Sequence, residues 1–330
     1  MTTSAPDTDQ SRTGEVQFGK WRTWYRVTEA RPVTQPAPHP VTRAPVVVLH
    51  GGPGSAHDYL LAYADLAATG RAVVHYDQLG CGRSTHLPYE PTAFWTIDLF
   101  LDQLDTLLAA LQFGSGYHVL GHSWGGILAV EHALRRPPGL KSLVVADAPA
   151  SMPLWISESK RLRAQLAPHV RQALERHEGD GTLQDPEYQT ALKQYYDRHV
   201  CQLDPLPEAI RRSEVESQSD PTTYFKMWGP NECYITGTLR DWSAVDRLHL
   251  IAVPALVVSG VDDQATEAVV RPFLERIPNV RWRQLRGASH NPHLEARQVC
   301  LEAVAQFLQQ NDPTRTQNPQ QEERTLLHEH

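Results

Sequence analysis

The sequence has no excess of basic residues, no long hydrophobic segment and no ordered set of cysteines. Its 31 lysine and arginine residues are outnumbered by 38 acidic ones, and this formal net charge of −7 argues against a nucleic acid partner. It contains no run of about 18 apolar residues, the length that a membrane-spanning helix needs. Residues 1–14 are polar and lack the apolar core of a signal peptide. We therefore expect a cytoplasmic protein that binds neither nucleic acid nor membranes.

Metal and disulfide patterns are missing as well. The 16 histidines include no HExxH motif, so we expect no metal site. The cysteines are too few and too irregularly spaced for a CxxC site or a disulfide framework, and free thiols are the expectation. They are Cys81, Cys201, Cys233 and Cys300.

Apolar strand patterns and helical patterns alternate along most of the chain. Continuously apolar strands that alternate with helices are typical of a parallel sheet with helices on both faces, which is the α/β class. The alternation stops between residues 153 and 241, where charged helical patterns follow one another, and we expect an inserted helical cap there. The expected strands are residues 20–29, 45–50, 72–77, 117–123, 140–149, 253–260 and 280–285.

The domain boundaries follow from this alternation. The α/β core is expected to comprise residues 15–152 and 242–312, with the helical cap at 153–241. The first two expected strands are joined by a proline-rich segment, and we predict that they form a hairpin. Residues 1–14 and 313–330 are rich in polar and charged residues without periodicity and are predicted to be disordered tails.

The segment GHSWG, Gly121–Gly125, matches the G-x-S-x-G pattern of a nucleophilic serine. A predicted strand precedes it and a predicted helix follows it, as this motif requires. Glycines at both ends permit the sharp turn that raises the serine side chain above the sheet. We therefore predict that Ser123 is a nucleophile.

A serine hydroxyl needs a base, and the base needs a group that orients it. Both follow Ser123 in the expected order of acid and then histidine. The segment GVDDQ after a predicted strand offers Asp263, our choice, and Asp262, the alternative. The segment SHNPH after the next strand offers His290 as the base, whereas His293 falls at the start of the final helix and is expected to form hydrogen bonds or simply to be solvated.

The glycine-rich loop HGGPG, residues 50–54, follows an earlier strand. Acyl transfer to serine needs two N–H donors for the developing oxyanion, one from the residue after the nucleophile and one from such a loop. Trp124 is the first donor, Gly52 is our choice for the second and Gly51 is the alternative. A phosphate-binding P-loop would end in Gly-Lys-Ser/Thr, which is absent here.

Several motifs in this order resemble the proline iminopeptidase family of α/β-hydrolases, peptidase family S33. They are HGGPG, DQLGCGRS, GHSWGG, WGPNECYITGTLRDW and SHNPHLE, and the resemblance runs from about Gly19 to Leu308. The details FGKWRTWYRV, HDYL and GRSTHLP look most similar to the bacterial L-proline amide hydrolases, or L-amino acid amidases, within that family. The resemblance implies an α/β-hydrolase fold and cleavage of an amide bond next to an unblocked N-terminal residue, often proline, without a cofactor.

The resemblance also implies substrate-binding residues. The family binds the substrate ammonium with acidic side chains, one of which falls on Glu232 in the segment Gly229-Pro230-Asn231-Glu232. A second family carboxylate corresponds to Gln264, which is neutral and puts the preference for a free amine in doubt. Without the resemblance, we would prefer to interpret Glu232 as part of a salt bridge on the cap surface or between the cap and the core. Aromatic residues near these motifs are candidates for lining the pocket, or for packing in the core: Trp95, Trp155, Trp228 and Tyr234.

We thus predict a serine hydrolase with the catalytic triad Ser123, Asp263 and His290. Its expected reaction is hydrolysis, through an acyl-enzyme, of an amide, anilide or peptide bond in a small substrate with a free N-terminal residue such as proline. The alternatives are an esterase, lactonase or acyltransferase that uses the same triad, and a non-catalytic ligand receptor with this fold. The sequence leaves the acyl residue, the leaving group and the oligomeric state open.

Overall fold

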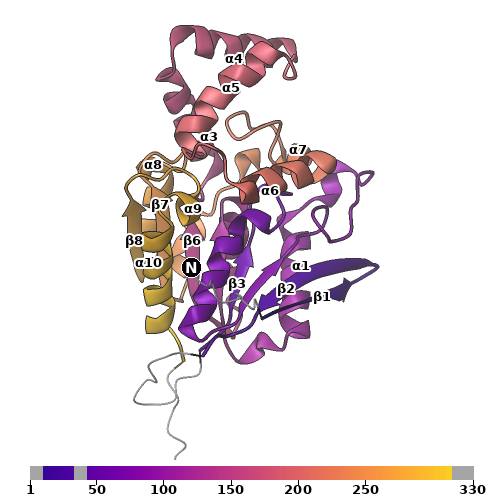
Figure 1. The fold of residues 1–330 in the computed structure, drawn as a ribbon, viewed down its shortest axis with the longest axis vertical. Coiled ribbons are helices and arrows are strands. Elements are labelled where there is room, and N and C mark those ends of the chain that lie inside the picture. The colour runs from indigo at the N-terminus through magenta and orange to yellow at the C-terminus, as the bar shows by residue number, and fades with distance from the viewer. Residues whose placement is uncertain (1–9, 33–42, 314–330) are drawn as a thin grey trace, which may run out of the picture.

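A computed structural model describes residues 10–32 and 43–313 of the chain (Figure 1). One mixed sheet of eight strands runs through the described part, in the order β1-β2-β4-β3-β5-β6-β7-β8. All neighbouring strands from β4 to β8 are parallel, whereas β2 is antiparallel to both β1 and β4. The strands are β1 (Ser11–Phe18), β2 (Trp21–Thr28), β3 (Val46–Leu49), β4 (Val73–Tyr76), β5 (Tyr117–His122), β6 (Leu140–Ala146), β7 (Ala255–Gly260) and β8 (Val280–Leu285).

The predicted α/β class and parallel sheet are confirmed, but the predicted hairpin is wrong. The hairpin is formed by β1 and β2, which pair from Phe18 and Trp21 outward. Strand β4 lies between β2 and β3, so the two strands expected to pair are not neighbours. Residues 11–14, predicted to belong to a disordered tail, are the first half of β1. The remaining predicted tail residues, 1–9 and 314–330, lie outside the described residues.

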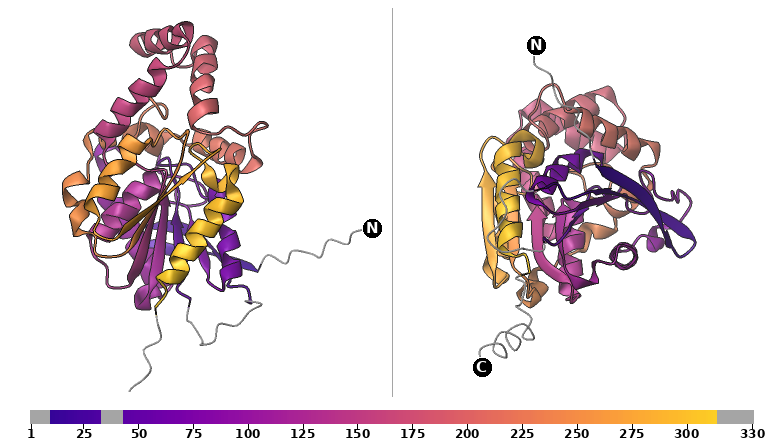
Figure 2. Two further views of the ribbon diagram at one scale, coloured as in Figure 1. Left: turned by 90° about the vertical axis from the view of Figure 1, so that its left-hand side faces the viewer. Right: turned by 60° about the horizontal axis from the view of Figure 1, so that its bottom comes forward.

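Helices cover both faces of the sheet, as the two further views show (Figure 2). Successive strand residues point to opposite faces, so Val47 packs into one hydrophobic cluster while Val46 and Val48 pack into another. The first cluster contains residues of α1 (Ile97–Ala110), α2 (Trp124–Leu134) and α8 (Glu267–Arg276). The second contains residues of the 3₁₀ helix η1 (Asp58–Thr69) and of α10 (Arg297–Gln310).

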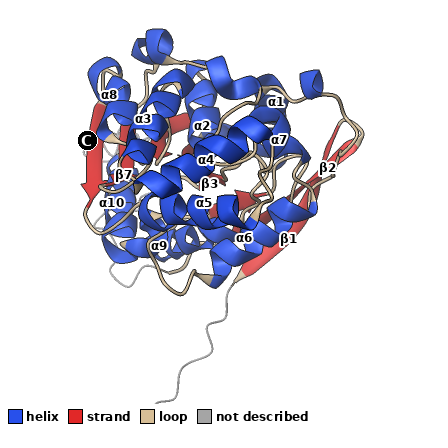
Figure 3. Ribbon diagram, turned by 90° about the horizontal axis from the view of Figure 1, so that it is seen from above, coloured by secondary structure: helices blue, strands red, loops and turns tan. Residues whose placement is uncertain are grey.

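Five α-helices lie between β6 and β7 in the chain, where the alternation of strands and helices in the sequence stops. Figure 1 shows them at the upper end of the sheet, and Figure 3 looks down on α4 and α5 from above. Helices α3, α4 and α5 share a hydrophobic cluster separate from those of the sheet, which includes Leu174, Tyr188 and Tyr195. The helices are α3 (Met152–Ala164), α4 (Pro168–Asp180), α5 (Pro186–His199), α6 (Glu208–Ser219) and α7 (Thr222–Met227).

The far end of the chain is tied back to the middle of the sheet by Asp312. Its carboxylate accepts hydrogen bonds from Arg71 at 3.0 and 3.2 Å, from Arg43 at 2.8 Å and from the Ala44 N–H at 3.1 Å, and it lies 3.2 Å from Nε2 of His118. The side chains of Arg71 and Asp312 are 0% and 1% exposed. Burial alone would raise the pKa of Asp312, but these neighbours lower that pKa to about 2.

None of the helices in the described residues is long and apolar enough to cross a membrane.

Candidate active site

Ser123 stands at a strained turn between β5 and α2. It has a φ of 56° and a ψ of −123°, a conformation that is uncommon for a residue with a side chain. Its flanking glycines make the turn possible. A Cβ on Gly121 would lie 2.0 Å from the Gly125 carbonyl oxygen, and a Cβ on Gly125 would lie 2.1 Å from the carbonyl oxygen of Leu49. The turn therefore has the geometry that a nucleophilic serine in this motif requires.

The predicted acid and base are hydrogen-bonded to each other. Nδ1 of His290 lies 2.7 Å from Oδ1 of Asp263, and both side chains are buried. The same oxygen accepts the Ala265 N–H at 2.9 Å. The alternative acid, Asp262, is exposed. Burial alone would lower the pKa of His290, but the nearby carboxylate of Asp263 outweighs that effect and raises it.

Ser123 and His290 line the same cleft, which has a volume of about 1120 Å³. His122, the residue before Ser123, holds the backbone at His290 in place, because its Nε2–H donates to the His290 carbonyl oxygen at 2.7 Å. The cleft extends from the serine between α5 and α6, and its lining includes Gly52 and Glu232. The structure thus gathers the predicted nucleophile, base and amine ligand around one cavity.

The glycine-rich loop presents a free N–H at Gly52 and not at Gly51. The Gly51 N–H donates to the Tyr59 hydroxyl at 2.7 Å, so Gly51 is a poor choice as oxyanion donor. Gly52 has a φ of 108° and lines the cleft. Among residues 10–32 and 43–313 we find no partner for the N–H groups of Gly52 and Trp124. Trp124 is the first residue of α2, where N–H groups have no partner within the helix.

His50 holds this loop to the next strand and takes no part in the Asp263–His290 pair. Its Nε2 accepts the Gln78 N–H at 2.9 Å, and its carbonyl oxygen accepts the Gln78 side-chain amide at 2.8 Å. Gln78 in turn accepts the indole N–H of Trp124 at 2.7 Å. Burial lowers the pKa of His50 to about 4, so the imidazole is neutral at pH 7. The two loops that carry the candidate oxyanion donors are therefore linked by one buried glutamine.

Glu232 reaches the cleft from the segment after α7. The Tyr224 hydroxyl donates to its Oε1 at 2.5 Å, and the Gln264 side-chain amide donates to its Oε2 at 3.1 Å. Burial raises the pKa of Glu232. The protonated form of His290 partly offsets this rise, because its positive charge favours the carboxylate. The surface salt bridge, which was the alternative for Glu232, is not what the structure contains, because both carboxylate oxygens have neutral donors.

The other predicted substrate contacts lie behind the cleft wall. Gln264 is fully buried, so it acts on Glu232 and does not face the cavity. Trp228 matches the core-packing alternative, because its side chain is 0% exposed and packs edge-to-face against Trp155. Tyr234 is half-buried and is not among the residues that line the cleft. Aromatic residues near a motif are thus no guide to the cavity, since most of them pack in the core.

His293 is a structural residue, as expected. Its Nε2 donates to the Tyr59 carbonyl oxygen at 3.0 Å, its ring stacks on Tyr63, and burial lowers its pKa to about 3. The four cysteines are free and buried, which agrees with the expectation of unpaired thiols.

Sequence reasoning missed Tyr59, His122 and Asp147. The Tyr59 hydroxyl accepts from the Gly51 N–H and lies 2.8 Å from Nδ1 of His122, so a chain of hydrogen bonds joins the glycine-rich loop to His290. Asp147 follows β6, and an acid at the carboxyl end of a parallel strand near the nucleophile was the available signal. Tyr59 offered none, because a tyrosine in an amphipathic segment looks like any core residue.

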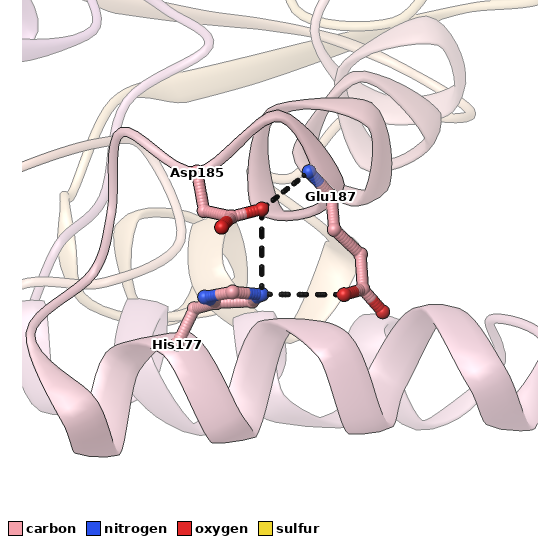
Figure 4. Close-up of side chains that lie close together, drawn as sticks. All are labelled: His177, Asp185 and Glu187. Atoms are coloured by element: carbon pink, nitrogen blue, oxygen red, sulfur yellow. Dashed lines mark hydrogen bonds and ion pairs between the residues drawn. The ribbon is translucent and has the colours of Figure 1, made fainter.

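A cluster that could suit a metal ion lies between α4 and α5 (Figure 4). Nε2 of His177 lies 3.8 Å from Oδ1 of Asp185 and 3.5 Å from Oε2 of Glu187. These atoms already have partners. Asp185 accepts the Glu187 N–H at 2.8 Å and so caps α5, while the Arg176 guanidinium bonds to Glu187 and lies 3.2 Å from His177. Because a fixed cation already stands at the cluster, we assign it to stabilisation of the α4–α5 corner.

Comparisons with known proteins agree with this geometry. Residues 44–297 match the family model of the alpha/beta hydrolase fold. The chain is 36% identical over 265 residues to a proline iminopeptidase of Saccharolobus solfataricus, covering 80% of this chain and 84% of that protein. It is similar to the crystal structure of VinJ, with a TM-score of 0.86 and 48% identity, and to that of a proline iminopeptidase from Mycobacterium smegmatis, with a TM-score of 0.85 and 46% identity. Each of these two alignments covers 91% of this chain and 99% of the other. The chain belongs to the proline iminopeptidase family of α/β-hydrolases.

Proposed function

We propose that this protein hydrolyses the bond that follows an unblocked N-terminal proline residue in small peptides and amides, with Ser123, His290 and Asp263 as its catalytic triad. The observation that carries the proposal is the cleft itself, in which a strained serine, a histidine paired to a buried carboxylate and the acid Glu232 face one cavity. The relatives named proline iminopeptidase support the choice of proline.

In the proposed reaction, the Ser123 hydroxyl attacks the carbonyl carbon of the scissile bond while Nε2 of His290 takes its proton. Asp263 accepts the hydrogen bond from Nδ1 and stabilises the imidazolium that forms. The N–H groups of Gly52 and Trp124 stabilise the oxyanion. The tetrahedral intermediate then expels the amine, which receives the proton from His290. Water attacks the acyl-enzyme in the same way and releases proline.

Glu232 is the proposed ligand of the substrate's secondary ammonium. A charged amine that gives up part of its hydration in the cleft needs a carboxylate partner. The two donors on Glu232, from Tyr224 and Gln264, favour its ionised form and fix its orientation. Gln264 is therefore a positioning residue. Because it replaces the second carboxylate of the family, Glu232 alone supplies a negative charge to the amine.

The size of the cleft supports a peptide or other extended leaving group. Its volume of about 1120 Å³ exceeds the roughly 300–1,000 Å³ of sites that enclose drug-sized ligands. A proline residue fills only a small part of that space, so several residues beyond the scissile bond can be accommodated. Small amides, the substrates implied by the resemblance to L-proline amide hydrolases, fit the same site but leave most of it to water.

A substrate panel tests the proposal. Hydrolysis of proline anilide, prolinamide, a prolyl tripeptide, their N-acetylated forms and a simple ester is measured with the native protein and with Ser123→Ala. We expect the free-amine prolyl substrates to be preferred, and Ser123→Ala to lose about 10³-fold or more in kcat. Full turnover by Ser123→Ala would refute the nucleophile. An ester turned over faster than every prolyl amide would favour the esterase, lactonase or acyltransferase alternative.

The amine site is tested separately with Glu232→Gln. Loss of one charge from a partly buried ammonium–carboxylate pair is expected to cost about 1–3 kcal/mol, or roughly 5- to 150-fold in kcat/KM for proline anilide. The slow background rate on N-acetylated proline anilide is expected to stay within about threefold, because that substrate has no ammonium. An unchanged ratio of the two rates would remove Glu232 from the amine site. If the native protein turns over no substrate and a fluorophosphonate does not label it, the remaining alternative is a non-catalytic ligand receptor.

A further inference from the structure

A second acid lies beside the proposed triad acid. Asp147 follows β6 directly, with a φ of 52°, and its side chain is fully buried. Strands β6 and β7 are paired, and the Asp147 N–H donates to the Val258 carbonyl oxygen at 2.8 Å. Oδ1 of Asp147 accepts the Gly260 N–H at 3.2 Å. The chain thus holds Asp147 against the end of the strand that leads to Asp263.

The Asp147 side chain is a neighbour of the Asp263 side chain, and each has one oxygen without a partner. Oδ2 of Asp147 and Oδ2 of Asp263 are both buried, and neither has a hydrogen-bond partner among the residues that the structure describes. Two adjacent buried carboxylates cannot both carry a charge. One proton placed between the two acids removes a charge and satisfies both oxygens at once, since a neutral carboxylic acid is a donor.

The surroundings decide which acid holds this proton. Oδ1 of Asp263 accepts from His290 and from the Ala265 N–H, both of which favour its ionised form. Within the described residues, the Asp147 carboxyl group accepts just one hydrogen bond, from the Gly260 N–H at 3.2 Å. Burial and the neighbouring Asp263 charge raise the pKa of Asp147 well above its ordinary value. The ionisable groups around Asp147 are Asp263, His122, Cys300, Tyr59 and Tyr63.

None of these groups supplies a positive charge that would ionise Asp147. His122 is the only imidazole among them, and its Nε2 lies 3.8 Å from Oδ2 of Asp147. That nitrogen already donates to the His290 carbonyl oxygen at 2.7 Å, and burial lowers the pKa of His122 well below its usual range. Tyr59, Tyr63 and Cys300 are neutral at pH 7, because burial raises the pKa of each.

We propose that Asp147 is a positioning residue that remains a neutral acid, donates its O–H to Oδ2 of Asp263 and so fixes the carboxylate that orients His290. The inference rests on the proposed function, because it assumes that Asp263 is the triad acid. A donor on Oδ2 restricts rotation of the carboxylate and keeps Oδ1 in line with Nδ1 of His290. It also withdraws charge from Asp263 and thereby moderates how strongly the histidine is held protonated.

Three variants in the full chain test the proposal: Asp147→Asn, Asp147→Ala and Asp263→Asn. Activity is measured as kcat/KM on proline anilide. The pH profile is taken from the rate at which a fluorophosphonate labels Ser123, since that reagent has no amine to titrate. Asparagine keeps a neutral donor and tolerates a positive φ, so Asp147→Asn is expected to stay within about threefold of the native protein with an unchanged profile.

Asp147→Ala removes the donor. We expect it to lower kcat/KM by about 100-fold through misplacement of His290, and to move the low-pH limb of labelling to higher pH, because Asp263 then holds the imidazolium more strongly. Asp263→Asn is expected to lose about 10⁴-fold. If Asp147→Asn falls as far as Asp263→Asn, Asp147 works as an ionised acid and the proposal is wrong. It is equally wrong if Asp147→Ala matches the native protein in both rate and profile.

A spectroscopic measurement keeps the test decisive even if Asp147→Ala does not fold. The infrared difference spectrum between the native protein and Asp147→Asn at pH 7 is expected to show the carbonyl stretch of a protonated carboxyl group. Absence of that band refutes the neutral acid. Failure of the proposed function gives a different result, since Asp263→Asn and Ser123→Ala would then retain turnover whatever Asp147 does.

Discussion

Replacing Asp312 by asparagine is expected to destabilise the fold severely. Asparagine has the size of aspartate but no charge, so the guanidinium of Arg71, which is 0% exposed, loses its buried counter-ion. Removing one partner of a buried ion pair typically costs about 3–5 kcal/mol, because the remaining charge stays buried without compensation. The bonds from Arg43 and the Ala44 N–H to the carboxylate weaken at the same time. We therefore expect a loss of about 3–5 kcal/mol in the free energy of unfolding.

Urea unfolding followed by tryptophan fluorescence measures this loss, with Asp65→Asn as the matched control. Asp65 also pairs with an arginine, Arg297 at 2.7 Å, but both side chains are 49% exposed, and such pairs contribute about 0–1 kcal/mol. A loss for Asp312→Asn no larger than for the control would refute the reasoning.

The same comparison has a pH dependence. Asp312 has a lowered pKa in the folded state, so its contribution is complete above the ordinary value of about 3.8 and is lost as the pH falls toward about 2. The difference between native protein and Asp312→Asn is expected to be constant from pH 5 to 7 and to shrink only below about pH 4. A difference that already shrinks near pH 6 would indicate that His118 carries the effect.

Two further predictions concern the nucleophile and its base. Because the pKa of His290 is raised above its ordinary 6.5 and the neutral imidazole is the base, fluorophosphonate labelling of Ser123 is expected to fall with decreasing pH through a midpoint above 6.5; a flat rate down to pH 6 would contradict this. Gly125→Ala is expected to abolish labelling and lower the Tm, because its Cβ would lie 2.1 Å from the Leu49 carbonyl oxygen. Gly179→Ala is the control, because a Cβ there meets no atom within 4 Å. We expect this control to be neutral or to stabilise the protein by about 1 kcal/mol. An active Gly125→Ala with a native Tm would show that the turn has more room than the structure indicates.

The sequence was a good guide to the parallel part of the sheet and a poor guide to its edge. Strands β5 and β7 are continuously buried and β6 is buried except at Lys141, and such apolar runs between helices are distinctive. Strand β1 (SRTGEVQF) has mostly polar residues and lies at the sheet edge, so it looked like part of a tail. The position of β4 between β2 and β3 could not be predicted, because pairing depends on tertiary packing and not on order in the chain.

The candidate site shows the same division. Ser123, Asp263 and His290 were named in advance because each follows a recognisable strand in a fixed order. The choice between Gly51 and Gly52 needed coordinates, since it depends on one hydrogen bond from Gly51 to Tyr59. The distinction between Glu232 in the cleft and Gln264 behind it depends on side-chain direction, which no spacing in the sequence reveals.

The order in which the chain supplies these groups affects when activity can arise during synthesis. The turn that carries the proposed nucleophile is complete once α2 has been made, but the proposed acid and base follow β7 and β8, after all five inserted α-helices. A ribosome-bound chain that ends before β7 carries a serine without a base. Asp312, which neutralises the buried Arg71, comes later still. A nascent chain is therefore expected to remain inert toward peptides until β7, β8 and Asp312 have emerged and the two halves of the sheet have closed.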